Sequence, residues 1–166
     1  MQELAAELGV NRATLFRWVG SRDDLLAEII WSLAEPTLAL AVSDAPGSGG
    51  QRLASIMGRF VALLDEADFF REFLRREPER ALRILTTRAS TVQSRLVTAV
   101  ETLVREEITR TGMHPPLPPR DLAYLIVRIV ESFLYAPIIT GEEHDTAMAA
   151  RAITALLGSD APSGKS

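Results

Sequence analysis

A short segment near the start of the chain groups side chains that can read DNA. It runs from Asn11 to about Val19, between Gly9 and Gly20. An arginine can pair with guanine through two hydrogen bonds, and an alanine or threonine methyl group can contact the methyl group of thymine. With Leu15 and Val19 directed inward, the outer face and flanks of this predicted helix carry Arg12, Ala13, Thr14, Arg17 and Trp18.

The neighbouring residues predict the elements that position this surface. Residues 1–8 form a short helix in this interpretation, with Leu4 and Leu8 facing inward. Gly9 supplies a tight turn, because glycine tolerates positive φ. Asn11 and Ser21 are suitable N-caps for a second and a third helix. A helix, a short glycine turn and a second helix make the helix-turn-helix layout, in which the second helix enters the major groove.

The charge of this region also allows a plainer interpretation, an ordinary solvated helix surface. Residues 1–35 hold three arginines and six acidic residues, and the whole chain has a net charge of −4. The acidic residues lie in the flanking helices, however, and the predicted reading helix has none. Arg22, at the start of the third helix, is placed to contact a DNA phosphate. DNA binding is therefore the favoured of the two interpretations.

The stretch LAAELGVNRATLFRWVGSRDDLLAEII, from Leu4 to Ile30, closely resembles the helix-turn-helix of the tetracycline-repressor (TetR) family. The matching features are Gly9-Val10, Thr14-Leu15-Phe16, Val19, Arg22 and Leu25-Leu26. The resemblance implies a homodimeric transcriptional repressor that binds palindromic double-stranded operator DNA and leaves it when a small effector binds. It places DNA contacts at Arg12, Ala13, Thr14, Phe16, Arg17, Trp18 and Arg22. Phe16 lacks the phosphate-binding hydroxyl of the usual tyrosine, and Trp18 replaces a common histidine or tyrosine.

The same resemblance places one further helix before Met1, so the first helix of the DNA-binding region is expected to be missing. Either the true start lies upstream, or the chain is a trimmed version, and a chain shortened in this way should bind DNA poorly. The alternative function is therefore a helical dimer that does not bind DNA and serves as a ligand-binding or protein-binding module.

The remainder of the chain has a helical hydrophobic period throughout, so the predicted fold class is all-α. One amphipathic helix is expected around Leu53 to Leu64 and one long helix from Glu79 to Arg110. A four-helix bundle across a twofold axis is expected from Arg120 to Ile138 and from about Thr146 to Leu157. The predicted regions are a helix-turn-helix (1–35), an effector-binding and dimerisation domain (36–158) and a disordered tail (159–166).

A polar ridge on an otherwise apolar helix marks a candidate ligand site. Tyr124, Arg128, Glu131 and Tyr135 follow one another at steps of four, three and four. Either Arg128 and Glu131 simply pair with each other, or the ridge anchors the polar head of a ligand. Phe60 and Phe73 complete the candidate site as apolar lining, although each is also a plausible core residue.

Two further strings resemble the QsdR-like subgroup of TetR regulators, which is associated with control of lactone signal degradation. They are FLRREPERALRILTTRA (Phe73 to Ala89) and RIVESFLYAPIITGEEHD (Arg128 to Asp145). The resemblance implies a lactone or an acyl compound as effector. The apolar residues and the polar ridge themselves predict a pocket under the long helix, closed by the helix from Arg120 to Ile138.

Composition and motifs argue against several other classes. The chain has 166 residues with 47% hydrophobic and 24% charged residues, as in a folded domain, and it has no cysteine. It has no convincing nucleophile and base pair, no phosphate loop and no zinc-protease motif, so no enzyme, cofactor or metal is predicted. A metal-dependent enzyme using Glu142, Glu143 and His144 is the weakest alternative, since an acidic helix start explains that cluster. No membrane span or secretory signal is expected, which makes the cytoplasm the default location.

Overall fold

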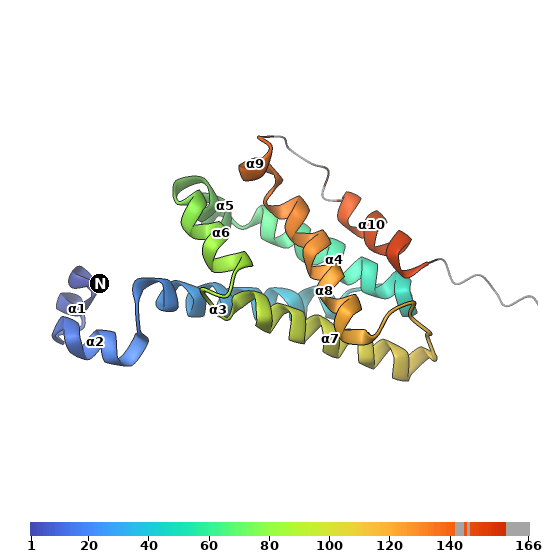
Figure 1. The fold of residues 1–166 in the computed structure, drawn as a ribbon, viewed down its shortest axis with the longest axis horizontal. Helices are drawn as coiled ribbons and strands as arrows, with labels where there is room; N and C mark the ends of the chain where they lie inside the picture. The colour runs from blue at the N-terminus through green and yellow to red at the C-terminus, as the bar shows by residue number, and fades with distance from the viewer. Residues whose placement is uncertain (142–144, 146, 159–166) are drawn as a thin grey trace, which may run out of the picture.

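The computed structural model describes residues 1–141, 145 and 147–158, and in these it contains helices and no strand, which confirms the all-α prediction. Figure 1 shows the order of the helices. They are α1 (Gln2–Glu7), α2 (Arg12–Val19), α3 (Arg22–Ser43), α4 (Gly49–Glu66), α5 (Asp68–Arg76), α6 (Pro78–Thr86), α7 (Val92–Thr111), α8 (Pro119–Leu134), α9 (Ala136–Ile139) and α10 (Ala147–Leu157).

The N-terminal helices begin and end where their capping residues dictate. The Asn11 side chain accepts a hydrogen bond from the Thr14 amide at 2.8 Å, and Ser21 forms a reciprocal capping box with Asp24. Gly20 has a φ of 72°, and a Cβ atom there would lie 2.6 Å from the Asp24 carboxylate. Glycine is therefore required at this turn, which separates α2 from α3.

The larger part of the chain packs into one bundle around a shared apolar core. Helices α3, α4, α7, α8 and α10 pack on one another, and the α5–α6 hairpin lies over the N-terminal half of α3 (Figure 1). The predicted amphipathic face of α4 is buried, since Leu53, Ile56, Met57 and Phe60 are each at most 1% exposed. Helices α1 and α2 lie beyond the N-terminal end of α3, outside this core (Figure 1).

The prediction of one helix from Glu79 to Arg110 was wrong, because the chain breaks between α6 and α7. No glycine or proline marks the break; hydroxyl groups compete there for the backbone instead. The Ser90 hydroxyl donates to the Ile84 carbonyl at 2.5 Å and accepts from the Val92 amide at 3.2 Å. Thr87 caps the same turn by accepting from the Ala89 amide at 3.1 Å.

The predicted helix from Arg120 to Ile138 was also too long, because α8 ends at Leu134 and a separate turn, α9, follows. Pro137 explains the interruption, since proline has no amide hydrogen and its ring clashes with the carbonyl four residues earlier. Leu8 was predicted to face inward, yet it is 55% exposed, and Ala5 is the buried residue of α1 instead.

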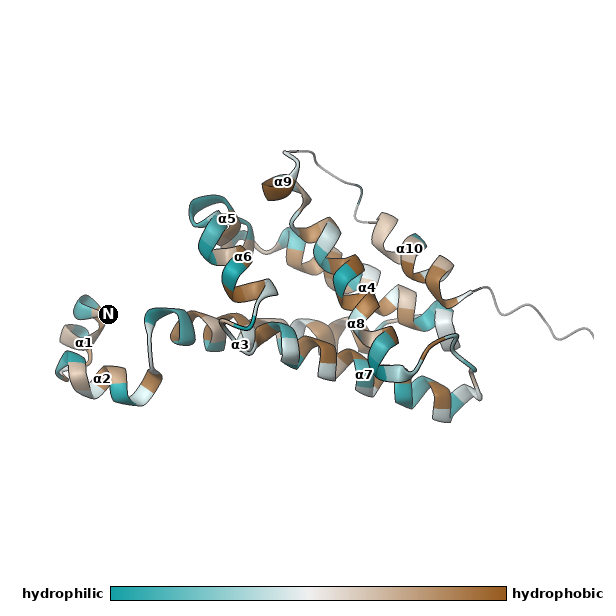
Figure 2. Cartoon of the chain, in the orientation of Figure 1, coloured by the Kyte–Doolittle hydropathy of each residue, from teal (hydrophilic) through white to brown (hydrophobic). Residues whose placement is uncertain are grey.

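Helix α3 crosses the predicted boundary at residue 35, so the two predicted regions share it. Its length and apolar composition would also allow it to cross a membrane. This was not predicted from the sequence, because Glu28 and Glu35 interrupt the uncharged runs of the helix. In Figure 2 the ribbon of α3 begins with hydrophilic residues and then carries many apolar ones. In the fold, α3 packs against α4, α6 and α7, and core helices of bundles have the same composition.

A buried carboxylate fastens the start of α4 to α7. Glu107 is 1% exposed and accepts hydrogen bonds from Arg52 at 2.7 Å, Arg110 at 2.6 Å and the Gly49 amide at 2.9 Å. Burial acts to raise the pKa of Glu107, but these three donors together lower it below its usual value. The charge is thus fully partnered, and its role is structural.

Candidate DNA-reading helix and effector cavity

Helix α2 presents an open surface of the composition expected for DNA reading. Only Leu15 is fully buried in this helix, at 2% exposed, so it anchors α2 to its neighbours. Phe16 is 58% exposed and Trp18 is 62% exposed. Of the other predicted contacts in α2, Thr14 is half-buried and the exposed ones are Arg12, Ala13 and Arg17.

Arg22, the predicted phosphate contact, already has a partner in the larger domain. Its guanidinium lies 3.0 Å from the Glu77 carboxylate at the junction of α5 and α6, and its side chain is 55% exposed. An exposed pair of this kind is worth at most about 1 kcal/mol, so Arg22 can exchange Glu77 for another anion.

Further ion pairs connect the N-terminal half of α3 to the helices that cover it. Asp23 pairs with Arg83 and, at 3.2 Å, with Arg80, both on α6. Farther along, Glu28 receives two hydrogen bonds from Arg95 of α7, at 2.7 and 2.9 Å. The arginines of α6 thus hold the start of α3 in place through these ion pairs.

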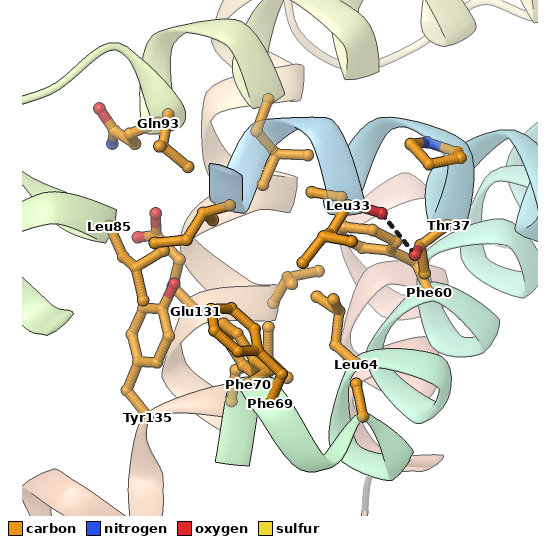
Figure 3. Close-up of a pocket in the computed structure, with 18 of the residues that line it drawn as sticks. Leu33, Thr37, Phe60, Leu64, Phe69, Phe70, Leu85, Gln93, Glu131 and Tyr135 are labelled. Carbon is orange, nitrogen blue, oxygen red and sulfur yellow. Dashed lines mark hydrogen bonds between the residues drawn. The ribbon is translucent and has the colours of Figure 1, made fainter. Parts of the chain in front are cut away.

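A cavity of about 440 Å³ lies between α3, the α5–α6 hairpin and helices α4, α7 and α8 (Figure 3). Its walls are mainly apolar. They include Leu33 and Pro36 of α3, Phe60 and Leu64 of α4, Phe69 and Phe70 of α5, Leu85 of α6, and Leu96 of α7. Cavities of this size with few polar groups are typical sites for small organic ligands.

One end of the cavity is polar. Glu131 lines it with a side chain only 4% exposed, and the Tyr135 ring lies beside it with its hydroxyl directed toward the carboxylate (Figure 3). Arg128 Nη1 lies 2.5 Å from Glu131 Oε2, but this oxygen receives no well-directed hydrogen bond from any residue that the structure describes. Burial outweighs the Arg128 charge and raises the pKa of Glu131 to about 7. Burial, followed by the Glu131 charge, also raises the pKa of Tyr135.

The structure brings three of the six predicted ligand residues to the cavity, Phe60, Glu131 and Tyr135. The other three predicted residues do not line this cavity. Phe73 is buried in the core and stacks on Phe69, and Tyr124 and Arg128 lie on the outside of α8, beside α7. The ridge of α8 is continuous, but other helices cover only its C-terminal half.

The contribution of α3 to the cavity was missed from the sequence. Leu33 and Thr37 lie one helical turn apart and face the cavity, and the Thr37 hydroxyl donates to the Leu33 carbonyl at 2.7 Å (Figure 3). The only sequence signal for this wall was the apolar run along α3, and such a run is equally typical of a helix in a packed core. Glu142, Glu143 and His144 lie outside the described residues, and in the described part of the chain no group of acidic and histidine residues could hold a metal ion.

A helix-turn-helix followed by a helical bundle is an architecture found among transcriptional regulators. The model of the tetracycline-repressor-like C-terminal domain matches residues 48–158. The chain therefore belongs to the TetR family, whose members are transcription factors and not enzymes. This confirms the family resemblance found in the sequence.

Among solved structures, the chain is similar to the transcriptional repressor QsdR of R. erythropolis, from the TetR family. The two chains are 29% identical, the match covers 94% of this chain and 82% of QsdR, and the TM-score is 0.87. No curated protein matches the chain.

Proposed function

We propose that the chain is a cytoplasmic regulator that binds operator DNA as a homodimer and leaves it when a small amphipathic molecule enters the cavity. The main support is that α3 belongs to both sites. It follows the reading helix directly, and the cavity is lined by its residues Ile30, Leu33, Ala34, Pro36 and Thr37. A ligand that moves α3 would also move α2. The similarity to QsdR, itself a transcriptional repressor, supports repression as the mode of regulation.

The outer faces of α8 and α10 support the homodimer. These helices pack side by side (Figure 1), and their outward residues include apolar side chains such as Leu125, 37% exposed, and Met148, 42% exposed. Helix pairs of this kind bury such surfaces by forming a four-helix bundle with a second copy. The two reading helices of a dimer would then meet successive major grooves of a palindromic site.

The cavity supports an amphipathic effector, since its walls are apolar and its polar groups gather at one end. The resemblance to QsdR-like regulators adds a lactone or an acyl compound as a specific expectation, which remains a prediction. Entry of such a molecule would compete with the present packing of α3 on α4, α6 and α7.

Selection of duplexes from a random library, followed by gel-shift titration at several salt concentrations, tests this function. We expect a palindromic consensus and an affinity that falls steeply with salt, because lysine or arginine contacts to phosphate release counterions. If the chain binds ligands but shifts no duplex at low salt, the alternative of a ligand-binding or protein-binding module would replace this proposal.

A further inference from the structure

The ionisable groups that line the cavity are all acidic or phenolic in the described residues. Glu131 and Tyr135 lie at its inner end, and Asp68 lies at its open edge, where it pairs with Arg71 at 2.6 Å. The walls from α3, α4, α6 and α7 contribute no charged side chain among these lining residues. An anionic ligand would therefore meet negative charge and find no cation within the cavity.

The carboxyl group of Glu131 is under-partnered for its burial. A fully buried carboxylate needs several donors, as Glu107 has with two arginines and a backbone amide. Glu131 has one cation, Arg128, whose own side chain is 42% exposed and thus partly engaged with solvent. No described residue donates a well-directed hydrogen bond to its Oε2. A donor placed inside the cavity would complete the site.

We propose that the cavity takes an organic cation, a protonated amine on an apolar chain or ring, with its ammonium group held by the Glu131 carboxylate and the Tyr135 hydroxyl. This inference rests on the proposed effector site. The ammonium group supplies the donors that Glu131 lacks, and the apolar part lies along α3 and α4 against Leu33, Phe60 and Leu64. The rings of Phe70 and Tyr135 add favourable contacts for a cation.

The ionisation of Glu131 predicts the direction in which ligand affinity changes with pH. Because burial raises the pKa of Glu131 to about 7, the carboxyl group is partly protonated at neutral pH. A cation binds the ionised form, so its affinity rises with pH, whereas a carbonyl group would prefer the protonated form and bind better at low pH. The charged and titratable groups facing Glu131 are Arg128 and Tyr135 on its own helix segment, with Asp68 at the cavity edge.

Calorimetric titration of the full chain, without DNA, with four probes of similar chain length tests the proposal. The probes are n-octylammonium, n-octanol, n-octanoate and an uncharged alkyl γ-lactone. We expect octylammonium to bind at least about tenfold more tightly than octanol or the lactone, and octanoate to bind most weakly. Its affinity should rise about tenfold between about pH 6 and pH 8, a range in which the amine stays protonated.

Substitutions distinguish the proposed contact with Glu131 from a general effect of negative charge near the cavity. Glu131→Gln should lower the octylammonium affinity about tenfold or more and change the octanol affinity less than about twofold. Asp68→Asn is the matched control, an acid at the open edge, and should leave both affinities nearly unchanged. If Glu131→Gln fails to fold, Tyr135→Phe and the pH series of the unchanged protein carry the test, with an expected loss of about threefold or more for Tyr135→Phe.

The proposal is overturned if octanol, octanoate or the lactone binds as tightly as octylammonium, if none of the probes binds, or if the octylammonium affinity falls with pH. It is also overturned if a folded Glu131→Gln variant binds octylammonium like the parent. DNA takes no part in this titration, so each of these results leaves operator binding and its release by another ligand open to the separate gel-shift test.

Discussion

The Arg22 guanidinium and the Glu77 carboxylate form an ion pair of 3.0 Å between residues 55 positions apart, and so connect the start of α3 to the α5–α6 junction. Arg22 is also the residue that the sequence assigns to a DNA phosphate. The same cation thus has two possible anionic partners, one within the chain and one on DNA. Arg22 and Glu77 are both accessible to solvent, so an exchange of ionic partners costs little free energy.

Glu77→Gln should strengthen DNA binding, because it removes the competing anion and frees Arg22 for phosphate. The gain should be at most about fivefold, the scale of one exposed ion pair. Gel-shift titration against one selected duplex measures it. The double variant with Arg22→Ala is the control, since it lacks Arg22 but still frees Arg80, the other cation that pairs with Glu77. An equal gain in the double variant would show that Glu77 acts through its charge alone and not through Arg22.

Arg17→Ala and Arg22→Ala should weaken DNA binding in different ways. Arg22→Ala should lower the affinity for all duplexes alike and reduce the salt slope by about one. Arg17→Ala should in addition relax base preference, at a cost of about 1–3 kcal/mol on the preferred site if it pairs with guanine. The quantity to compare between the parent and each variant is the ratio of the affinities for the selected site and for an unrelated duplex. Unchanged binding by both variants would show that the assigned reading face is wrong.

Local signals made the N-terminal region predictable from the sequence. Asn11, Gly20 and Ser21 act through their own backbone geometry and their near neighbours, so their roles as caps and turns could be read directly. The break between α6 and α7 could not be predicted in this way, because no glycine or proline marks it. Ser90 acts there by donating a hydrogen bond to a carbonyl six residues away. The interruption by Pro137 was available in the sequence and was overlooked.

The candidate cavity was only partly predictable, for a different reason. Glu131 and Tyr135 were recognisable as polar residues on a helix predicted to be buried. Tyr124 and Arg128 share the same ridge, and which half of a ridge is covered depends on helices far away in the sequence. The wall from α3 was hidden because an apolar side chain such as Leu33 has the same pattern whether it faces a core or a cavity.

Leu125→Asp should convert the dimer into a monomer, because it would place a charge on the outer face of α8 that the second copy is proposed to cover. Sedimentation of the parent should show a species near twice the chain mass of 18.2 kDa, and the variant should sediment near the single mass. Leu40→Asp is the control, since Leu40 is similarly exposed, at 49%, but lies on α3. A monomeric parent at micromolar concentration would contradict the dimer.

Glu107→Ala should destabilise the fold by about 2–4 kcal/mol, because Arg52, Arg110 and the Gly49 amide would lose their shared partner. Urea unfolding at neutral pH measures this loss. The pKa of Glu107 is lowered in the folded state, so its contribution is present above its usual pKa and disappears as the pH falls through the folded value. The difference between parent and variant should therefore shrink in acid. Glu101→Ala, which removes a more exposed acid of the same helix, should cost less.

Glu131 should have the opposite pH dependence, because its folded-state pKa is raised. The unfolded carboxyl group loses its proton near its usual pKa of 4.5, whereas the folded group keeps it up to about pH 7. Between these values the folded state holds more protons than the unfolded state, so stability falls as the pH rises, by at most about 3 kcal/mol, and then levels off. Glu131→Gln removes this slope, and the variant should gain stability relative to the parent as the pH rises from about 5 to 8. Urea unfolding of both proteins at each pH gives the difference directly, in which the other titrating groups cancel. A difference that is flat across this range would show that Glu131 is ionised in the folded protein with an ordinary pKa, and the Arg128 pair alone would then account for the buried charge.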